Sequence, residues 1–249
     1  MGELQQVRRE ASHLHIGAGA SLQSAWQLLA SEWPSLQDVW LRFASAPLRA
    51  VGTMGGNVAN GSPIGDSAPV LMALGATVVL RCGDQTRRVA LEDFYTGYLQ
   101  NVMAAGEFLQ AIEVPRAAAN TQVHAHKISK RFDCDISALC AGFSMTVQDG
   151  HVAAVRLAYG GMAATVKRAA HAEAALLGQP WGDSGMVAVK AAQAALAQDF
   201  APLTDLRASA AYRLQVAQNL LHKLWLQTRS SEPLPPKQTS VWARQEAGV

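Results

Sequence analysis

The 249-residue sequence is poor in cysteine, which occurs only as Cys82, Cys134 and Cys140. These three scattered thiols fit neither a disulfide framework nor a C-x-x-C metal motif, so we expect no iron–sulfur cluster, zinc or other metal site in this chain. Long apolar runs are also absent. No stretch reaches the ~20 residues of a membrane-spanning helix, and residues 1–10 lack the apolar core of a signal peptide. We therefore expect no membrane partner and a cytoplasmic location.

A strong charge imbalance is missing as well. The net charge is +2, and acidic and basic residues are mixed along the chain, so no basic stripe indicates a nucleic-acid partner. We find no internal repeat. With 49% hydrophobic and 16% charged residues, the composition is that of a globular chain long enough for two modest domains.

The most distinctive stretch that is present is a glycine-rich segment within residues 50–76. Gly52, Gly55, Gly56, Gly61 and Gly65 are interleaved with Thr53, Asn57, Asn60 and Ser62. Glycines let the backbone adopt positive φ and approach a bound group closely. Successive free N–H groups in such a turn can cradle a phosphate or a polar heterocycle. The segment matches neither G-x-G-x-x-G nor G-x-x-x-x-G-K-[ST], so neither of those phosphate-binding loops is predicted.

The alternative interpretation of this segment is an ordinary surface loop followed by a helix cap. A single Gly-Gly pair would favour that alternative, because short motifs often occur by chance. Five glycines with four small polar residues favour a ligand-binding loop instead. Asp66 stands ahead of Ser67, Ala68 and Pro69, which predicts a helix N-terminus before the apolar run 70–74.

The first part of the chain predicts short strands and helices in alternation. Strands are expected at 13–18, 77–81, 87–91 and 107–114, a helix from a Ser21 cap to Trp33-Pro34, a second helix at 36–44, and a short aromatic helix or turn at 92–98. We interpret His13 and His15 as the exposed face of their strand rather than as ligands. Phe43 is interpreted as core, with stacking on a planar ligand as the less favoured alternative.

The pattern changes after residues 115–122. A strand is expected at 123–130, and strands at 136–147 and 151–160 flank Asp149-Gly150, which strongly predicts a two-residue hairpin turn. Helices are expected at 168–177, 184–198 and 208–228. We therefore place one domain at 1–118, a second at 119–229, and a mobile tail at 230–249.

Several motifs together carry a resemblance to a known family. The run Val51-Gly-Thr-Met-Gly-Gly-Asn-Val-Ala-Asn-Gly-Ser-Pro-Ile-Gly-Asp66 resembles the flavin-binding loop of the xanthine dehydrogenase family, most closely its bacterial small subunit. Residues 91–98, 106–115 and 127–137 agree with it, and residues 160–168 and 208–213 resemble the small C-terminal domain of the same flavoproteins. The similarity runs from about residue 7 to residue 228.

The resemblance implies an α+β fold in which an incomplete PCMH-type FAD-binding domain precedes a C-terminal domain like that of the CO dehydrogenase flavoprotein. The implied function is that of the flavoprotein part of a molybdenum hydroxylase. Electrons would leave a purine at molybdopterin, cross iron–sulfur clusters and reach FAD, which reduces NAD. The implied partners are a molybdopterin-binding large subunit and an iron–sulfur domain or chain.

The same resemblance implies which residues contact FAD, and it implies no catalytic side chain here. Lys127 matches a position near the flavin ring, where a cation favours the reduced, anionic form; a solvated strand residue is the alternative for Lys127. The implied contacts are Phe43, Ala44, Thr53, Gly55, Gly56, Asn57, Asn60, Asp66, Leu109 and Lys127.

Two departures from the family pattern qualify the resemblance. Family members have iron–sulfur domains and an earlier FAD lobe, which holds the FAD pyrophosphate, whereas this sequence starts at Met1 after these segments. We therefore expect weaker binding of the FAD phosphates and an edge of the first sheet that is less covered. Cys134 stands where the family has an acidic residue. We rank three interpretations: an FAD-binding component or fragment of a xanthine dehydrogenase, a non-catalytic interaction module, and another phosphate-ligand-binding protein.

Overall fold

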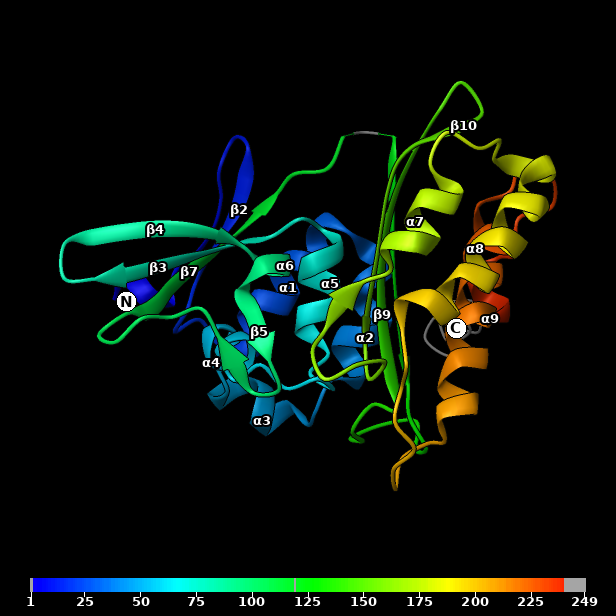
Figure 1. Cartoon of the computed structure of the whole chain (residues 1–249). Coiled ribbons are helices and arrows are strands. Elements are labelled where there is room, and N and C mark those ends of the chain that lie inside the picture. Colours follow the sequence, from blue (N-terminus) through cyan, green and yellow to red (C-terminus); the bar gives the residue numbers. More distant parts are fainter. Residues whose placement is uncertain (1, 119, 240–249) are drawn as a thin grey trace, which may run out of the picture.

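The computed structural model describes residues 2–118 and 120–239. These residues form two large antiparallel sheets, a small two-stranded sheet, and helices between and beside the large sheets. Figure 1 shows the elements in layers: the first sheet, a group of short helices, the second sheet and a final layer of helices. This arrangement confirms the expected α+β class with antiparallel sheets and helices. None of the helices in these two described stretches has the length and apolar content needed to traverse a bilayer.

The first sheet has five strands in the order β1-β2-β7-β3-β4, and each neighbouring pair is antiparallel. In β2, Leu14 and Ile16 are fully buried while His13 and His15 lie on the opposite, partly exposed face, as the alternation predicts. The strands are β1 Val7–Arg9, β2 His13–Gly17, β3 Thr77–Cys82, β4 Gln85–Ala90 and β7 Phe108–Pro115.

Short helices connect these strands and cover the buried face of the first sheet. Ser21 caps α1 as predicted, since its Oγ accepts a hydrogen bond from Ser24 N at 3.1 Å. The helices are η1 Glu3–Gln5, α1 Leu22–Glu32, η2 Pro34–Leu36, α2 Gln37–Arg42, α3 Ala46–Val51, α4 Met54–Ala59, α5 Ser67–Ala73 and α6 Leu91–Phe94, and β5 Tyr95–Gly97 pairs with β6 Gln100–Asn101.

The second sheet has four strands in the order β11-β10-β9-β8. Asp149 and Gly150 both have positive φ (51° and 74°), which confirms the predicted two-residue hairpin between β9 and β10. The elements are β8 Thr121–Ile128, β9 Leu139–Gln148, β10 His151–Gly160, β11 Lys167–Arg168, α7 Ala170–Leu176, η3 Gly182–Gly185, α8 Met186–Asp199, α9 Ala210–Thr228 and η4 Pro236–Gln238.

The second sheet is buried on both faces. Its outer face packs Leu139, Phe143 and Leu157 in one hydrophobic core with α7, α8 and α9. Its inner face contributes Val123, Ala125, Cys140 and Ala158 to the core of the first sheet. This sheet therefore joins the two halves of the chain.

Helix α5 lies directly on the inner face of the second sheet, and a glycine makes this close approach possible. A Cβ at Gly142 of β9 would lie 2.6 Å from the carbonyl oxygen of Pro69 and 2.8 Å from the Cα of Val70. Real Cβ contacts are essentially never this short, so a larger residue at position 142 would push α5 off the sheet.

Several boundaries differ from those predicted. The segment expected as a glycine-rich loop is largely helical, with α4 inside it, and the second predicted helix ends at Arg42 rather than Ala44. In the expected mobile tail, Ser231 N donates to Asp183 Oδ1 at 2.9 Å and Leu234 N donates to the carbonyl of Leu226 at 2.7 Å. Residues 240–249 of that tail lie outside the described residues.

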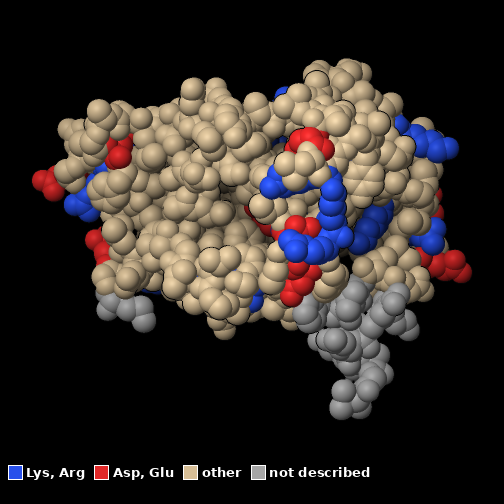
Figure 2. All heavy atoms as spheres, turned by 90° about the horizontal axis from the view of Figure 1, so that it is seen from below, with Lys and Arg blue, Asp and Glu red and all other residues tan. Residues whose placement is uncertain are grey.

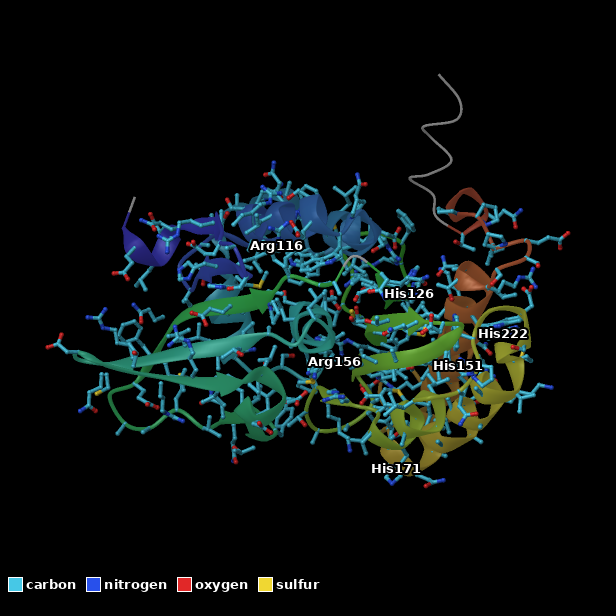
Figure 3. The ribbon with its side chains drawn as sticks, turned by 90° about the horizontal axis from the view of Figure 1, so that it is seen from above. Arg116, His126, His151, Arg156, His171 and His222 are labelled. Carbon is cyan, nitrogen blue, oxygen red and sulfur yellow. The ribbon has the colours of Figure 1, made fainter. Side chains whose placement is uncertain are left out.

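Two histidines of β8, the buried His126 and the partly buried His124, lie on the side of the sheet that faces the second core; Figure 3 labels His126 there. The His126 ring lies 5.8 Å from that of Phe143, and the His124 ring lies 6.5 Å from that of His126. Burial and the Lys223 ammonium lower the pKa of His124 to about 4 and the pKa of His126 well below its usual range. Both imidazoles are therefore neutral in the folded protein at pH 7.

These pKa shifts predict loss of stability in mild acid. The folded pKa of His124 lies below its unfolded value, so its contribution is complete above about pH 6.5 and is lost as the pH falls toward 4, at a cost of about 3 kcal/mol at pH 4. In urea titrations at several pH values, His124→Gln should flatten this part of the profile. His151→Gln, at an exposed histidine, is the control. An unchanged slope in His124→Gln contradicts the assignment.

Candidate cofactor site

The glycine-rich segment forms a short helix whose start is held by the rest of the fold. Thr53 is the N-cap of α4, and its Oγ1 accepts a hydrogen bond from Gly56 N at 3.1 Å. The N–H groups of Met54 and Gly55 donate to carbonyl oxygens in the turn between β2 and α1, each at 2.9 Å. Asn57 N donates to the Thr53 carbonyl at 3.0 Å. The expected cradle of free N–H groups is therefore not present at residues 54–57.

The two adjacent glycines of α4 have different physical roles. Gly55 is buried, and a Cβ there would lie 2.4 Å from the Cβ of Ala18 and 2.6 Å from its carbonyl oxygen. It is required so that α4 can pack against the turn after β2. Gly56 is exposed, and a Cβ there would meet only the Thr53 hydroxyl, at 2.8 Å. Of the two, only Gly56 presents backbone to a molecule approaching from outside.

In α4, Asn57 carries a buried polar atom without a hydrogen-bond partner among the described residues. Its Oδ1 is buried and accepts no hydrogen bond from the described residues. A buried acceptor without a donor is costly, and native structures contain few of them. Asn60, at the end of the same helix, is exposed. Asn57 is thus the residue of α4 whose side-chain acceptor receives no hydrogen bond from the described chain.

Asp66 occupies the predicted helix-start position, but its side chain does not cap α5. Instead, Asp66 Oδ2 forms an ion pair with Lys127 Nζ at 2.5 Å, and Asp66 Oδ1 accepts from Ser137 Oγ at 2.5 Å. Lys127 Nζ also donates to Ser137 Oγ at 3.0 Å. The predicted helix N-terminus after Asp66 is confirmed.

This cluster excludes one of the two interpretations of Lys127. Its side chain is 2% exposed and that of Asp66 is 6% exposed, so Lys127 is not a solvated strand residue. The Cys140 thiol lies 3.7 Å from the Asp66 carbonyl, and burial together with the Asp66 carboxylate raises the thiol pKa well above its usual range. The thiol is therefore protonated, and the cluster holds one cation and one anion.

The predicted residues near the flavin ring lie in or beside the first core. Phe43 and Leu109 are each 7% exposed and belong to the same hydrophobic cluster, and the Phe43 ring lies 6.0 Å from that of Trp26. Ala44 has a positive φ of 47°, so it forms a sharp turn directly after Phe43. The favoured interpretation of Phe43 as a core residue is confirmed.

Two arginines that we did not single out from the sequence shape this region. Arg49 is buried, and its Nη1 donates to the carbonyls of Phe43 at 2.7 Å and Ala44 at 3.1 Å, which holds the turn in place. Arg42 donates to the carbonyls of Lys127 at 2.9 Å and Phe132 at 2.8 Å, linking α2 to the end of β8. Neither contact has a signal in the sequence, because each depends on tertiary structure.

On the face of the molecule shown in Figure 2, neither acidic nor basic side chains predominate. Most of that face carries neither acidic nor basic side chains; those present form a cluster of both signs right of the centre, with further groups of both signs toward the left and right ends. A cavity of about 360 Å³ adjoins the end of β8, but its lining includes none of the ten residues predicted to contact FAD. The predicted contacts therefore lie outside this cavity.

Removing one member of the buried ion pair should be strongly destabilising. Lys127→Met leaves the Asp66 carboxylate buried without a cation, which should lower the free energy of unfolding by about 3–5 kcal/mol. The double variant Asp66→Asn/Lys127→Met should recover a large part of that loss. In urea unfolding, Glu10→Gln at the exposed Arg8–Glu10 pair should cost less than about 1 kcal/mol. Equal costs for Lys127→Met and Glu10→Gln contradict the role of the pair.

Comparison with known proteins places two family matches along the chain. Residues 1–117 match the family described as FAD binding domain in molybdopterin dehydrogenase. Residues 124–228 match the CO dehydrogenase flavoprotein C-terminal domain.

Individual relatives agree with these matches. Nicotinate hydroxylase hnxS of Emericella nidulans is 31% identical over 189 residues, and xanthine dehydrogenase/oxidase of Gallus gallus is 30% identical over 195 residues. The alignments cover 74% and 73% of this chain but only 14% of each relative. The carbon monoxide dehydrogenase medium chain of Afipia carboxidovorans is 28% identical over 225 residues, which are 90% of this chain and 77% of that one.

Solved structures show the same architecture. A crystal structure of the Cu,Mo-CO dehydrogenase superposes with a TM-score of 0.81 and 28% identity, covering 90% of this chain and 77% of the other. Quinoline 2-oxidoreductase from Pseudomonas putida 86 superposes with a TM-score of 0.78 at 24% identity, which shows a shared fold.

Proposed function

Because the chain belongs to the flavoprotein family of the molybdenum hydroxylases, we propose that it carries the FAD of a xanthine dehydrogenase and passes electrons from purine oxidation to NAD. The observation that carries this proposal is the succession of an FAD-binding domain and a flavoprotein C-terminal domain in one chain. Several of the relatives are named xanthine dehydrogenase, which favours a purine substrate. The family members are oxidoreductases.

The residues present fit an FAD molecule at the glycine-rich segment. The buried Asn57 Oδ1 lacks a donor, and FAD offers donors in its ribityl hydroxyls and its ring N3–H. Gly56 leaves the start of α4 open to close approach. When bound, FAD would supply the capacity to take up an electron pair and release it. We assign the contacts to α4, to the Phe43–Ala44 turn, to Leu109 and to the Asp66–Lys127 pair.

In this proposal the protein orients the cofactor and excludes water. Thr53 fixes the start of α4, and Arg49 fixes the Phe43–Ala44 turn through its two carbonyl contacts. Asp66 and Lys127 hold opposite charges at a fixed place in a dry environment, where electrostatic interactions are stronger than in water.

The assembly and location follow from the same proposal. We infer that the partners are a molybdopterin-binding large subunit and an iron–sulfur domain or chain, and that the protein acts in the cytoplasm. Among the relatives, a carbon monoxide dehydrogenase medium chain supports the idea of separate chains by its name. We also propose domain boundaries at 1–118 and 119–229, with residues 230–249 as a tail.

A non-catalytic interaction module is the second candidate function. It is favoured by the internal use of the N–H groups at residues 54–57 and by the mutual neutralisation of Asp66 and Lys127. Both sets of internal contacts leave fewer polar groups free to bind a phosphate or a flavin. This candidate predicts a folded chain with no affinity for FAD.

Flavin loading separates the two candidates. The purified chain is mixed with FAD, alone and together with the FAD lobe that precedes this region in the family, and is separated by gel filtration. We expect a flavin absorbance band to co-elute with the chain and NADH to reduce that flavin. A chain that is folded by circular dichroism but acquires neither property overturns the electron-transfer proposal in favour of the interaction module.

Substitutions in α4 test the site itself. Asn57→Ala removes the unsatisfied acceptor, and Gly56→Val places a branched side chain at the exposed start of α4. Each should weaken flavin binding at least about tenfold, which corresponds to about 1.4 kcal/mol. Asn219→Ala, at an exposed asparagine of α9, is the matched control and should bind normally. Equal flavin retention by all three variants rules out this site.

A further inference from the structure

The outer face of the first sheet brings together three side chains with metal-binding chemistry. His13 and His15 belong to β2, and Glu113 belongs to β7, far along the chain. One ligand atom from each of the three residues lies within 4.8 Å of the others. All three residues are partly buried.

The strand register explains why these side chains meet. His15 pairs directly with Glu113 in the antiparallel ladder, and His13 lies two residues before His15, so all three point to one face of the sheet. On the opposite face, Leu14 and Ile16 are fully buried in the first core. The backbone that carries the three side chains is therefore fixed by hydrogen bonds and by packing.

We propose that His13, His15 and Glu113 bind a zinc ion, with a water molecule in the fourth position. Two imidazole nitrogens and one carboxylate oxygen are a donor set that zinc uses in proteins when it keeps an open coordination position. Magnesium and calcium prefer oxygen donors, so two histidines select a transition metal over either of them. This site is independent of the flavin proposal and of its residues.

A neighbouring hydroxyl group orients one of the two imidazoles. Ser12 Oγ lies 3.1 Å from His13 Nδ1, and this contact fixes the orientation of the imidazole ring.

Arg88 is the main competitor for the carboxylate. Its Nε and Nη2 donate to the two Glu113 oxygens at 2.9 Å each. The Arg88 side chain is 62% exposed, and exposed ion pairs contribute at most about 1 kcal/mol. Each carboxylate oxygen also has a second lone pair, so Glu113 can bind a metal while it keeps a contact with Arg88.

The expectation from the sequence was that His13 and His15 are surface residues and not ligands. Two histidines in alternate positions of a strand indicate only that they share a face. The third donor comes from a strand that pairs with β2 in the folded protein, and no local spacing motif encodes that pairing.

The test is a titration of the metal-free chain with Zn²⁺ by calorimetry, with Co²⁺ absorption to identify the donor atoms. We expect one Zn²⁺ per chain and a Co²⁺ spectrum without thiolate bands. His15→Gln and Glu113→Gln should weaken Zn²⁺ binding at least about tenfold, since even residues behind the ligands commonly contribute that much. His151→Gln, at an exposed histidine outside the cluster, should leave it unchanged.

Exposed thiols are the alternative source of zinc binding. Cys82 and Cys134 are exposed, so the titration is repeated in a Cys82→Ser/Cys134→Ser background, where binding should persist. The proposal is overturned if the folded chain shows no saturable Zn²⁺ binding, if His15→Gln binds as tightly as the original chain, or if binding disappears with the two thiols.

Discussion

The buried ion pair between Asp66 and Lys127 is the interaction on which the relation of the two sheets depends. Asp66 directly precedes α5, Lys127 lies near the end of β8 in the second sheet, and Ser137 forms hydrogen bonds with both just before β9. Burying two charges is costly unless they remain close and hydrogen-bonded. Any relative movement of α5 and β8 would separate the charges in a dry interior. The pair therefore fixes how the second sheet sits on the helices of the first.

The packing of α5 adds a steric constraint to this electrostatic one. Gly142 allows the backbone of α5 to touch β9, and Arg42 ties α2 to the end of β8. The region that holds the predicted FAD contacts is thus fixed from both sides. The rigidity belongs to the interface between the halves of the chain and not to the glycines of α4, because Gly55 serves helix packing and the first N–H groups of α4 are used internally. A segment rich in glycine is here an ordered helix.

The parts of the fold that the sequence predicted well are those encoded by neighbouring residues. Asp149-Gly150 specifies its hairpin turn, and Ser21 caps a helix of regular apolar spacing. Long-range pairings were not predictable in this way. The sequence left Lys127 undecided between a solvated strand residue and a flavin neighbour, because its partner Asp66 lies on another element. The role of Arg49, which bonds two carbonyls of a turn, leaves no pattern in the sequence at all.

The pairing also changes what Lys127 can contribute to the proposed flavin site. An isolated ammonium near the ring would favour a reduced, anionic flavin. Lys127 is instead 2.5 Å from a carboxylate, so a cofactor beside it meets a dipole whose two charges largely cancel with distance. The influence of this dipole on the flavin then depends on which of its two charges faces the flavin ring rather than on its net charge. The orientation is set by Ser137, which donates to one Asp66 oxygen while Lys127 holds the other. Electrostatic tuning in the proposed site is consequently a property of this three-residue cluster and not of the lysine alone.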